Sequence, residues 1–228
     1  MHWLFPAVAT AASAAFAIAV LRQYAARRRT HQLAWGVSLA MFALASLALT
    51  IGVTAGWTPV GFKVYYLFGA MLNVPWLALG TVSLLARPLA RRAYQAGLVL
   101  FTAAGTVLLA LAEVAGPDLT ARVPEGKAFL PVPVRVLAVL GNTVGTLVVV
   151  GGAVASGLAL RHRRQLRPRF EGNLLIALGV LLAAGGGVFA FLDRSDKLAV
   201  GLALGASVMY LGFRRASAPV QPAAPVPP

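Results

Sequence analysis

KVYYLFGAMLNVPWLALGTVSLLARPLARR, residues 63–92, is the stretch that decides the fold. Between residues 64 and 86 it carries no charged side chain. At ~1.5 Å per residue, such a run is long enough to cross a bilayer core of roughly 30 Å as one helix. The segment therefore predicts a transmembrane helix, and the arginines close behind it mark a membrane boundary.

One face of this helix carries unusual chemistry for membrane depth. Five residues follow one another at spacings of three or four, which places them on one side of the helix: Tyr65, Gly69, Asn73, Trp76 and Gly80. A polar and aromatic face within the bilayer turns toward protein or water rather than lipid. We therefore predict that this face points inward and contributes to a ligand or partner site.

Pro75 interrupts the helix beside this face. Because proline has no N–H, the carbonyl of Met71, four residues earlier, loses its usual donor. The sequence thus predicts a kink, with an acceptor freed close to Asn73.

The composition is typical of an integral membrane protein. Of the 228 residues, 59% are hydrophobic and 11% are charged, and the mean hydropathy is +0.80. Soluble domains carry about 25% charged residues. The chain has no cysteine, which excludes disulfides, thiolate nucleophiles and cysteine-ligated metals.

Seven apolar runs predict an all-α transmembrane protein, a seven-helix bundle. The expected helices cover residues 3–21, 33–55, 64–86, 93–114, 133–160, 173–192 and 198–213, in one membrane domain over residues 1–215. The last helix is expected to be short. The Pro/Ala-rich tail over residues 216–228 is expected to be disordered.

The positive charges predict the orientation of the chain. With the N-terminus outside, the cytoplasmic segments carry fourteen arginines and one acid, Glu171, so that +13 of the net +14 lies on one side. An additional or missing span would break this alternation. We therefore predict an N-terminus outside and a C-terminus in the cytoplasm.

The densest basic segment is RHRRQLRPR, residues 161–169. Topology alone accounts for a basic cytoplasmic loop, and binding of anionic lipid headgroups is the added hypothesis. Nucleic acid is not expected as a partner. The candidate headgroup contacts are Arg161, Arg163, Arg164, Arg167 and Arg169.

The fifth run combines small and polar residues. Small residues at helical spacing let helices approach closely, and amide or hydroxyl side chains bond across the contact. Asn142 and Thr146 lie beside a stripe of such residues, so packing is the main interpretation and a ligand-lining role is the alternative. The stripe comprises Gly141, Gly145, Gly152 and Ser156.

Asn73 and Asn142 both occupy the first half of helices that run in the same direction. The first three helices and the last three are therefore open to interpretation as parallel repeats joined by the fourth, as in some transporter folds. Sequence identity between the two sets is too weak to decide this.

Near the outer boundary, Glu113 is the candidate acid. It is expected at the end of a helix, where it either pairs with Arg135 or extends to water. The loop over residues 115–132 follows it. Its composition fits both a lid and a plain connector.

Several chemistries are disfavoured by what the spans lack. His2, His31 and His162 all lie outside the predicted spans, which leaves no intramembrane histidine for haem, zinc or serine hydrolysis. No pair of carboxylates lies at membrane depth. We expect no catalytic residue, no metal site and no cofactor.

Three stretches carry a resemblance: YYLFGAMLNVPWLALGTVSLLA (65–86), GNTVGT (141–146) and GNLLIALG (172–179). In these the chain resembles a group of small uncharacterised integral membrane proteins of GC-rich bacteria, mainly actinobacteria. The resemblance covers most of the chain and implies a location in the bacterial plasma membrane. It implies no activity.

Three functions remain open at this point. The preferred one is a non-catalytic membrane protein that binds a lipid or a partner protein, as a sensor, scaffold or assembly factor. The second is a facilitator or transporter of a small neutral or amphipathic solute, with Asn73, Asn142 and the Pro75 kink lining a cavity. The third is an enzyme that modifies a lipid at the outer face through Glu113 or Asp193.

Overall fold

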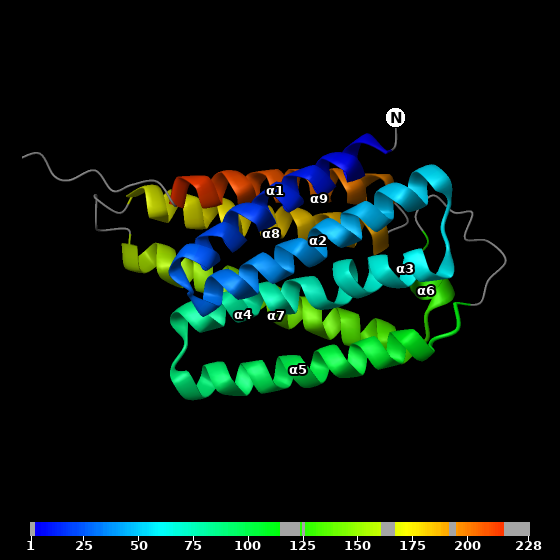
Figure 1. Cartoon of the computed structure of the whole chain (residues 1–228), viewed down its shortest axis with the longest axis horizontal. Coiled ribbons are helices and arrows are strands. Elements are labelled where there is room, and N and C mark those ends of the chain that lie inside the picture. Colours follow the sequence, from blue (N-terminus) through cyan, green and yellow to red (C-terminus); the bar gives the residue numbers. More distant parts are fainter. Residues whose placement is uncertain (1–2, 115–123, 125, 161–166, 192–194, 217–228) are drawn as a thin grey trace, which may run out of the picture.

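The structure is a computed structural model that describes residues 3–114, 124, 126–160, 167–191 and 195–216. In these ranges every regular element is a helix, and the long helices lie side by side along one axis (Figure 1). The prediction of an all-α fold is confirmed.

The long helices follow the apolar runs of the sequence. They are α1 (Leu4–Arg27), α2 (Thr30–Ala55), α5 (Pro88–Leu111), α7 (Val132–Leu160), α8 (Arg167–Phe191) and α9 (Ser195–Ala216). Between α2 and α5 lies a continuous helix, which we call the composite helix. It consists of α3 (Pro59–Tyr65), a π-helical segment η1 (Tyr66–Leu72) and α4 (Asn73–Leu85), and the short α6 (Gly126–Phe129) precedes α7.

Within the described residues, five helices are long and apolar enough to cross a membrane: α1, α2, the composite helix, α5 and the Val132–Ser156 part of α7. Helix α8 contributes a shorter apolar stretch, Leu174–Ala183. The described part of the chain is therefore all-helical, and its helices are those of a membrane protein.

Several predicted helix boundaries are wrong. The first helix runs on to Arg27, the composite helix begins at Pro59, and the last helix is not short. Apolar runs mark only the bilayer core, whereas a helix continues into the boundary until a cap ends it. At the start of α3, for example, the Thr58 hydroxyl accepts from the Gly61 N–H at 3.0 Å, with Pro59 in the first turn.

The expected helical position of Glu113 is also wrong. Helix α5 ends at Leu111, Ala112 has extended backbone angles, and Glu113 is exposed beyond it. The neighbouring Gly-Pro pair lies outside the described residues. Because the side chain stands beyond the helix, it reaches water without extending along an apolar surface.

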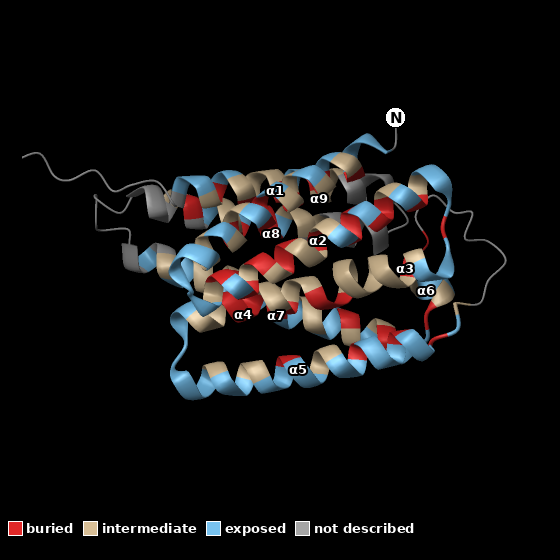
Figure 2. Ribbon diagram, in the orientation of Figure 1, coloured by how far each residue is buried: buried red, intermediate tan, exposed pale blue. Residues whose placement is uncertain are grey.

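Six helices close a ring. Helix α1 packs against α2, α2 against α4, α4 against α7, α7 against α8, α8 against α9, and α9 against α1. Helix α5 lies outside this ring, in contact with α4, η1 and α7 (Figure 1). Most of the α5 surface is exposed in the isolated chain, as Figure 2 shows, and in a membrane that surface faces lipid.

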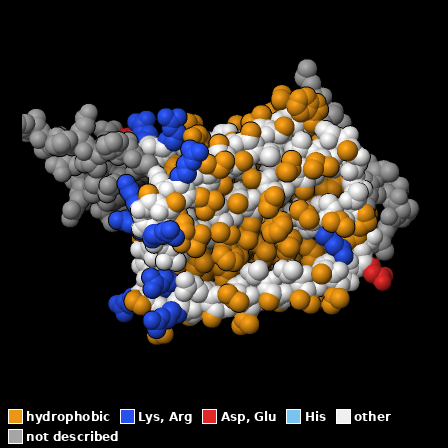
Figure 3. All heavy atoms as spheres, in the orientation of Figure 1, with side chains coloured by type: hydrophobic (Ala, Val, Ile, Leu, Met, Phe, Trp, Pro, Cys, Tyr) orange, Lys and Arg blue, Asp and Glu red, His pale blue; other side chains and the backbone are white. Residues whose placement is uncertain are grey.

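The two ends of the bundle differ in charge. The described arginines of the α1–α2 and α4–α5 connections and of the end of α9 gather at one end, which we call the arginine-rich end (Figure 3). Here Arg215 donates to a Glu171 carboxylate oxygen at 2.8 Å, which ties the end of α9 to the beginning of α8.

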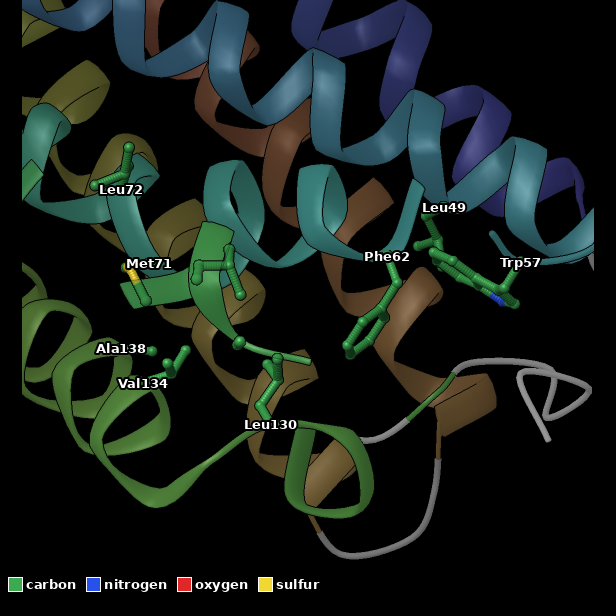
Figure 4. Close-up of a cluster of buried hydrophobic side chains, with 10 residues drawn as sticks. Leu49, Trp57, Phe62, Met71, Leu72, Leu130, Val134 and Ala138 are labelled. Carbon is green, nitrogen blue, oxygen red and sulfur yellow. The ribbon is translucent and has the colours of Figure 1, made fainter. Parts of the chain in front are cut away.

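Toward the opposite end, a cluster of buried apolar side chains, which we call the plug, fills the space between the end of α2, the composite helix, α5 and α7 (Figure 4). Phe62 and Met71 of the composite helix are fully buried in it. The short helix α6 covers it, and the Phe129 ring lies edge-on to the Phe62 ring at 5.8 Å. The plug consists of Leu49, Trp57, Phe62, Met71, Leu72, Leu109, Ala112, Leu130, Val134 and Ala138.

Candidate functional site

The predicted polar face of the composite helix lies against α2. The Ser38 hydroxyl is 2.9 Å from both the backbone oxygen and the side-chain oxygen of Asn73. A hydroxyl has one hydrogen, so Ser38 donates to one of these oxygens at a time. Ser38 is fully buried, and the contact therefore joins two helices inside the bundle.

Asn142 reaches the same helix from α7. Its side-chain nitrogen donates to the backbone oxygen of Ala70 at 2.5 Å. In the i→i+5 pattern of a π-helix, the donor for Ala70 O is the N–H of residue 75, and that residue is Pro75. Asn142 thus supplies the hydrogen bond that proline removes. Its own side-chain oxygen is buried without a partner.

Helix α5 supplies two further bonds. The Tyr94 hydroxyl donates to Pro75 O at 3.0 Å, and the Trp76 indole N–H donates to the Thr102 hydroxyl at 3.2 Å. Asn73 and Trp76 therefore meet different neighbours, α2 and α5, although their spacing is helical.

The remaining candidate residues lie elsewhere. The Tyr65 ring packs edge-on against the Trp57 ring at 5.4 Å, next to the plug, and Thr146 is half-buried on α7. The structure thus distributes Tyr65, Asn73, Trp76, Asn142 and Thr146 over several helix contacts. The polar groups of Asn73, Trp76 and Asn142 form hydrogen bonds between helices, and none of the five residues lines the cavity described below.

A cavity lies instead in the middle of the ring, in the half near the arginine-rich end. All six ring helices line it. From α1, α2 and α4 the lining residues are Phe16, Val20, Trp35, Leu39, Leu77, Thr81, Leu84 and Leu85. From α7, α8 and α9 they are Val149, Gly152, Ala153, Ser156, Ile176, Met209 and Phe213.

The polar side-chain groups of the lining residues are the hydroxyls of Thr81 and Ser156 and the indole N–H of Trp35, and the cavity measures about 80 Å³. The Trp35 indole packs on the backbone at Gly80, where any Cβ would overlap the ring. At the rim, Leu84 and Leu85 are 52% and 49% exposed, so the cavity is open on that side.

Two arginines lie close in the chain to residues that line the cavity. Arg87 follows Leu85 by two residues, and Arg214 directly follows Phe213. Both arginines are exposed. The cavity therefore has an apolar interior, and exposed arginines follow its lining residues on α4 and α9.

The headgroup contacts predicted from the sequence are not tested by this geometry. Arg161, Arg163 and Arg164 lie outside the described residues, and so do the side chains of Arg167 and Arg169, whose backbone belongs to α8.

No family model, curated protein or solved structure matches the chain. The function has to be argued from the cavity and its surroundings. In the described part of the chain, no group of three His, Asp or Glu side chains is placed to hold a metal ion.

Sequence reasoning missed the cavity because its lining residues look like ordinary apolar helix residues. Polar groups at membrane depth drew attention to the middle of the composite helix, whereas the cavity starts one turn further on, at Leu77. The available signal was indirect: Gly80 and Gly152 leave room beside Trp35 and Thr81, two of the lining residues.

Proposed function

We propose that this protein is a non-catalytic, multi-pass protein of the bacterial plasma membrane that binds an anionic lipid. The lipid's apolar chain occupies the central cavity, and its headgroup stays at the arginine-rich end. The observation that carries the proposal is an apolar cavity bounded by six helices, with its open rim beside Arg87 and Arg214.

The size of the cavity favours part of a chain over a whole small molecule. At about 80 Å³ it is well below the engineered cavity of about 150 Å³ that admits benzene. A few carbons of an acyl chain fit inside, and the rest of the lipid leaves past the half-exposed Leu84 and Leu85. Burial of those carbons contributes about 0.8 kcal/mol for each methylene.

The charge at the rim favours an anionic headgroup. Each Lys or Arg near an anionic surface contributes about 1 kcal/mol. Arg215 is engaged with Glu171, whereas Arg87 and Arg214 lie exposed next to the cavity residues. By the positive-inside rule this end faces the cytoplasm, which gives seven spans, an N-terminus outside and a cytoplasmic C-terminus.

The proposal is tested by mass spectrometry of the protein in native-lipid particles. We expect phosphatidylglycerol or another anionic lipid to remain bound to the wild-type protein. Ala153→Phe fills the cavity from α7 and abolishes retention. The matched control is Val154→Phe, at the next position and 47% exposed, which leaves retention intact.

Equal retention by Ala153→Phe and Val154→Phe would show that the lipid binds elsewhere. A second arm replaces Arg87 and Arg214 by Gln. We expect the bound lipids to shift from anionic to zwitterionic species while the total amount of bound lipid changes less. An unchanged lipid profile would remove the role assigned to these arginines.

A further inference from the structure

The cavity is lined by equivalent positions of two sets of three helices. We call α1, α2 and the composite helix the first unit, and α7, α8 and α9 the second unit. In the first helices, Phe16 lies 11 residues before the end of α1, and Val149 lies 11 residues before the end of α7. Val20 and Ala153 each lie 7 residues before the end of the same two helices. Leu39 and Ile176 both lie 9 residues after the beginning of their helices, α2 and α8.

The third helices of the two units, α4 and α9, also line the cavity at corresponding positions, shifted by one residue relative to the helix ends. Leu77 and Thr81 lie 8 and 4 residues before the end of α4, and Met209 and Phe213 lie 7 and 3 residues before the end of α9. The same rows of the two units therefore face one space.

The contacts between the two units are equivalent as well. The third helix of each unit packs against the first helix of the other, as α4 against α7 and α9 against α1. This is the arrangement of two parallel repeats about a twofold axis along the bundle, with the cavity on the axis. Helix α5 provides the return crossing between them from outside the ring.

We propose that the two units move relative to each other and carry the lipid of the cavity from one leaflet to the other. This inference rests on the proposed function, because it takes the same ligand in the same cavity. Transporters built from repeats bind substrate at the repeat interface and expose it alternately to the two sides. In the present structure the cavity is open near the arginine-rich end. Toward the other end of the bundle, the plug fills the space between the composite helix, α5 and α7.

The closed end is held by a bond between the units. Asn142 of the second unit donates to Ala70 O of the first, above the cavity. Nearby, a Cβ on Gly145 of α7 would lie 3.0 Å from Val74 O, so the two backbones are in close contact. Separation of the composite helix from α7 at the plug requires these contacts to open.

The first unit has a place where it can bend. The π-helical segment and Pro75 separate α3 from α4 at the level of the Asn142 bond, and such interruptions are sites of helix bending. No π-helical segment is assigned in α9, the corresponding helix, over its described residues. Movement of the half-helix 59–72 therefore opens the plug while α4 keeps its contacts with the cavity.

The first experiment measures lipid transfer between leaflets. The wild-type protein is reconstituted in phosphatidylcholine vesicles that contain fluorescent short-chain phosphatidylglycerol, and dithionite bleaches the outer leaflet. We expect bleaching beyond the outer-leaflet fraction with wild type and Val154→Phe, and loss of this excess with Ala153→Phe. If the protein retains lipid in the mass-spectrometric test but bleaching equals that of protein-free vesicles, the transfer proposal is overturned and the binding proposal stands.

The second experiment asks whether the plug opens. Because the chain contains no cysteine, a single Ala138→Cys variant reports on one site. Ala138 is 3% exposed within the plug, and its replacement by cysteine is a small change. We expect a membrane-impermeant maleimide to label it slowly from the plug side, and faster when Asn142→Leu removes the inter-unit bond.

The control is Leu140→Cys, which is 55% exposed on the outer surface of α7. Its labelling is not expected to respond to Asn142→Leu. Protection of Ala138→Cys in both backgrounds would overturn the proposed movement, whatever the transfer assay shows.

Discussion

At the scale of single residues, two glycines of membrane-length helices have opposite surroundings. Gly80 of α4 lies under the Trp35 ring, whereas a Cβ on Gly97 of α5 meets nothing within 4 Å. The first is needed for a close approach, and the second faces the outside of the bundle. The two positions allow the same substitution to be compared in a filled and in an open environment.

We predict that Gly80→Ala destabilises the protein by about 1–3 kcal/mol, because Trp35 has to shift from its place beside the cavity. Gly97→Ala is expected to be neutral or to stabilise by up to about 1 kcal/mol through helix propensity. Equilibrium unfolding in mixed micelles checks both changes. A Gly80→Ala variant as stable as Gly97→Ala would contradict the assigned contact.

Single residues also show what the sequence can and cannot predict. The spacing of Gly69, Asn73 and Gly80 correctly indicates a shared side, since Ala45, Ser38 and Trp35 of α2 contact them. The spacing does not reveal which group lies against this side of the helix. A polar group in a membrane helix is explained equally by a ligand and by a neighbouring helix, and here Ser38 supplies a neighbour.

At the scale of elements, the composite helix is held by side chains at the carbonyls around Pro75. Asn142 bonds Ala70 O, Ser38 lies at hydrogen-bond distance from Asn73 O, and Tyr94 bonds Pro75 O. The sequence predicts the kink at Pro75 and a freed acceptor, but it assigns that acceptor to Met71. The π-helical register shifts it to Ala70, because the pairing there spans five residues instead of four.

A double-mutant cycle tests this account. Asn142→Leu alone is expected to cost about 0.6–1.7 kcal/mol, the range measured for hydrogen bonds between membrane helices. In a Pro75→Ala background the new N–H supplies a donor, so the same Asn142→Leu change costs less. Unfolding free energies of the four proteins give the coupling. Thr143→Val, at an exposed neighbouring position, serves as the control.

Additive effects of Pro75→Ala and Asn142→Leu would mean that proline and asparagine act independently. The assignment of Asn142 as the replacement donor would then be wrong. An equal cost for Thr143→Val and Asn142→Leu would lead to the same conclusion.

Helices α8 and α9 pack closely against each other at two pairs of glycines. A Cβ on Gly179 would lie 2.7 Å from Gly205 O, and one on Gly212 would lie 2.7 Å from Gly172 O. The glycines recur at seven residues on both helices, so two successive levels of the antiparallel pair touch through backbone. Small residues generally serve such close packing in membranes.

We predict that Gly205→Val forces the two helices apart and costs about 1–3 kcal/mol. The control is Gly185→Val on α8, where a Cβ meets nothing within 4 Å. Thermal unfolding followed by circular dichroism in detergent compares the two. Similar midpoints for both variants would contradict the backbone contact between α8 and α9.

At the scale of the whole molecule, the sequence predicts the helices more reliably than their neighbours. Long apolar runs require helices in a bilayer because each backbone group has to bond within its own segment. The pairing of α4 with α7 and of α9 with α1, which encloses the cavity, depends on side-chain fit between segments far apart in the chain. Periodicity carries no information about that fit, so the cavity appears only in three dimensions.

We predict that reporter fusions place the two termini on opposite sides of the membrane. The described arginines of the α1–α2 and α4–α5 connections and of the end of α9 lie at one end of the bundle, whereas Arg135 lies at the other end, at the start of α7 (Figure 3). The positive-inside rule places the arginine-rich end in the cytoplasm. A C-terminal fluorescent fusion should be active, and an N-terminal phosphatase fusion should be active outside. Both termini on one side would require an even number of crossings and would separate the proposed mouth from the cytoplasmic leaflet.

The position of α5 has a consequence for how such a chain arises. A block of three crossings finishes on the membrane side opposite to where it starts, so a second copy in the same direction cannot follow it directly. One extra crossing has to be inserted, and a peripheral helix such as α5 meets that need without entering the ring. Its sequence is then constrained by its contacts with α4, η1 and α7 and by Leu109 in the plug, and not by the lining of the cavity.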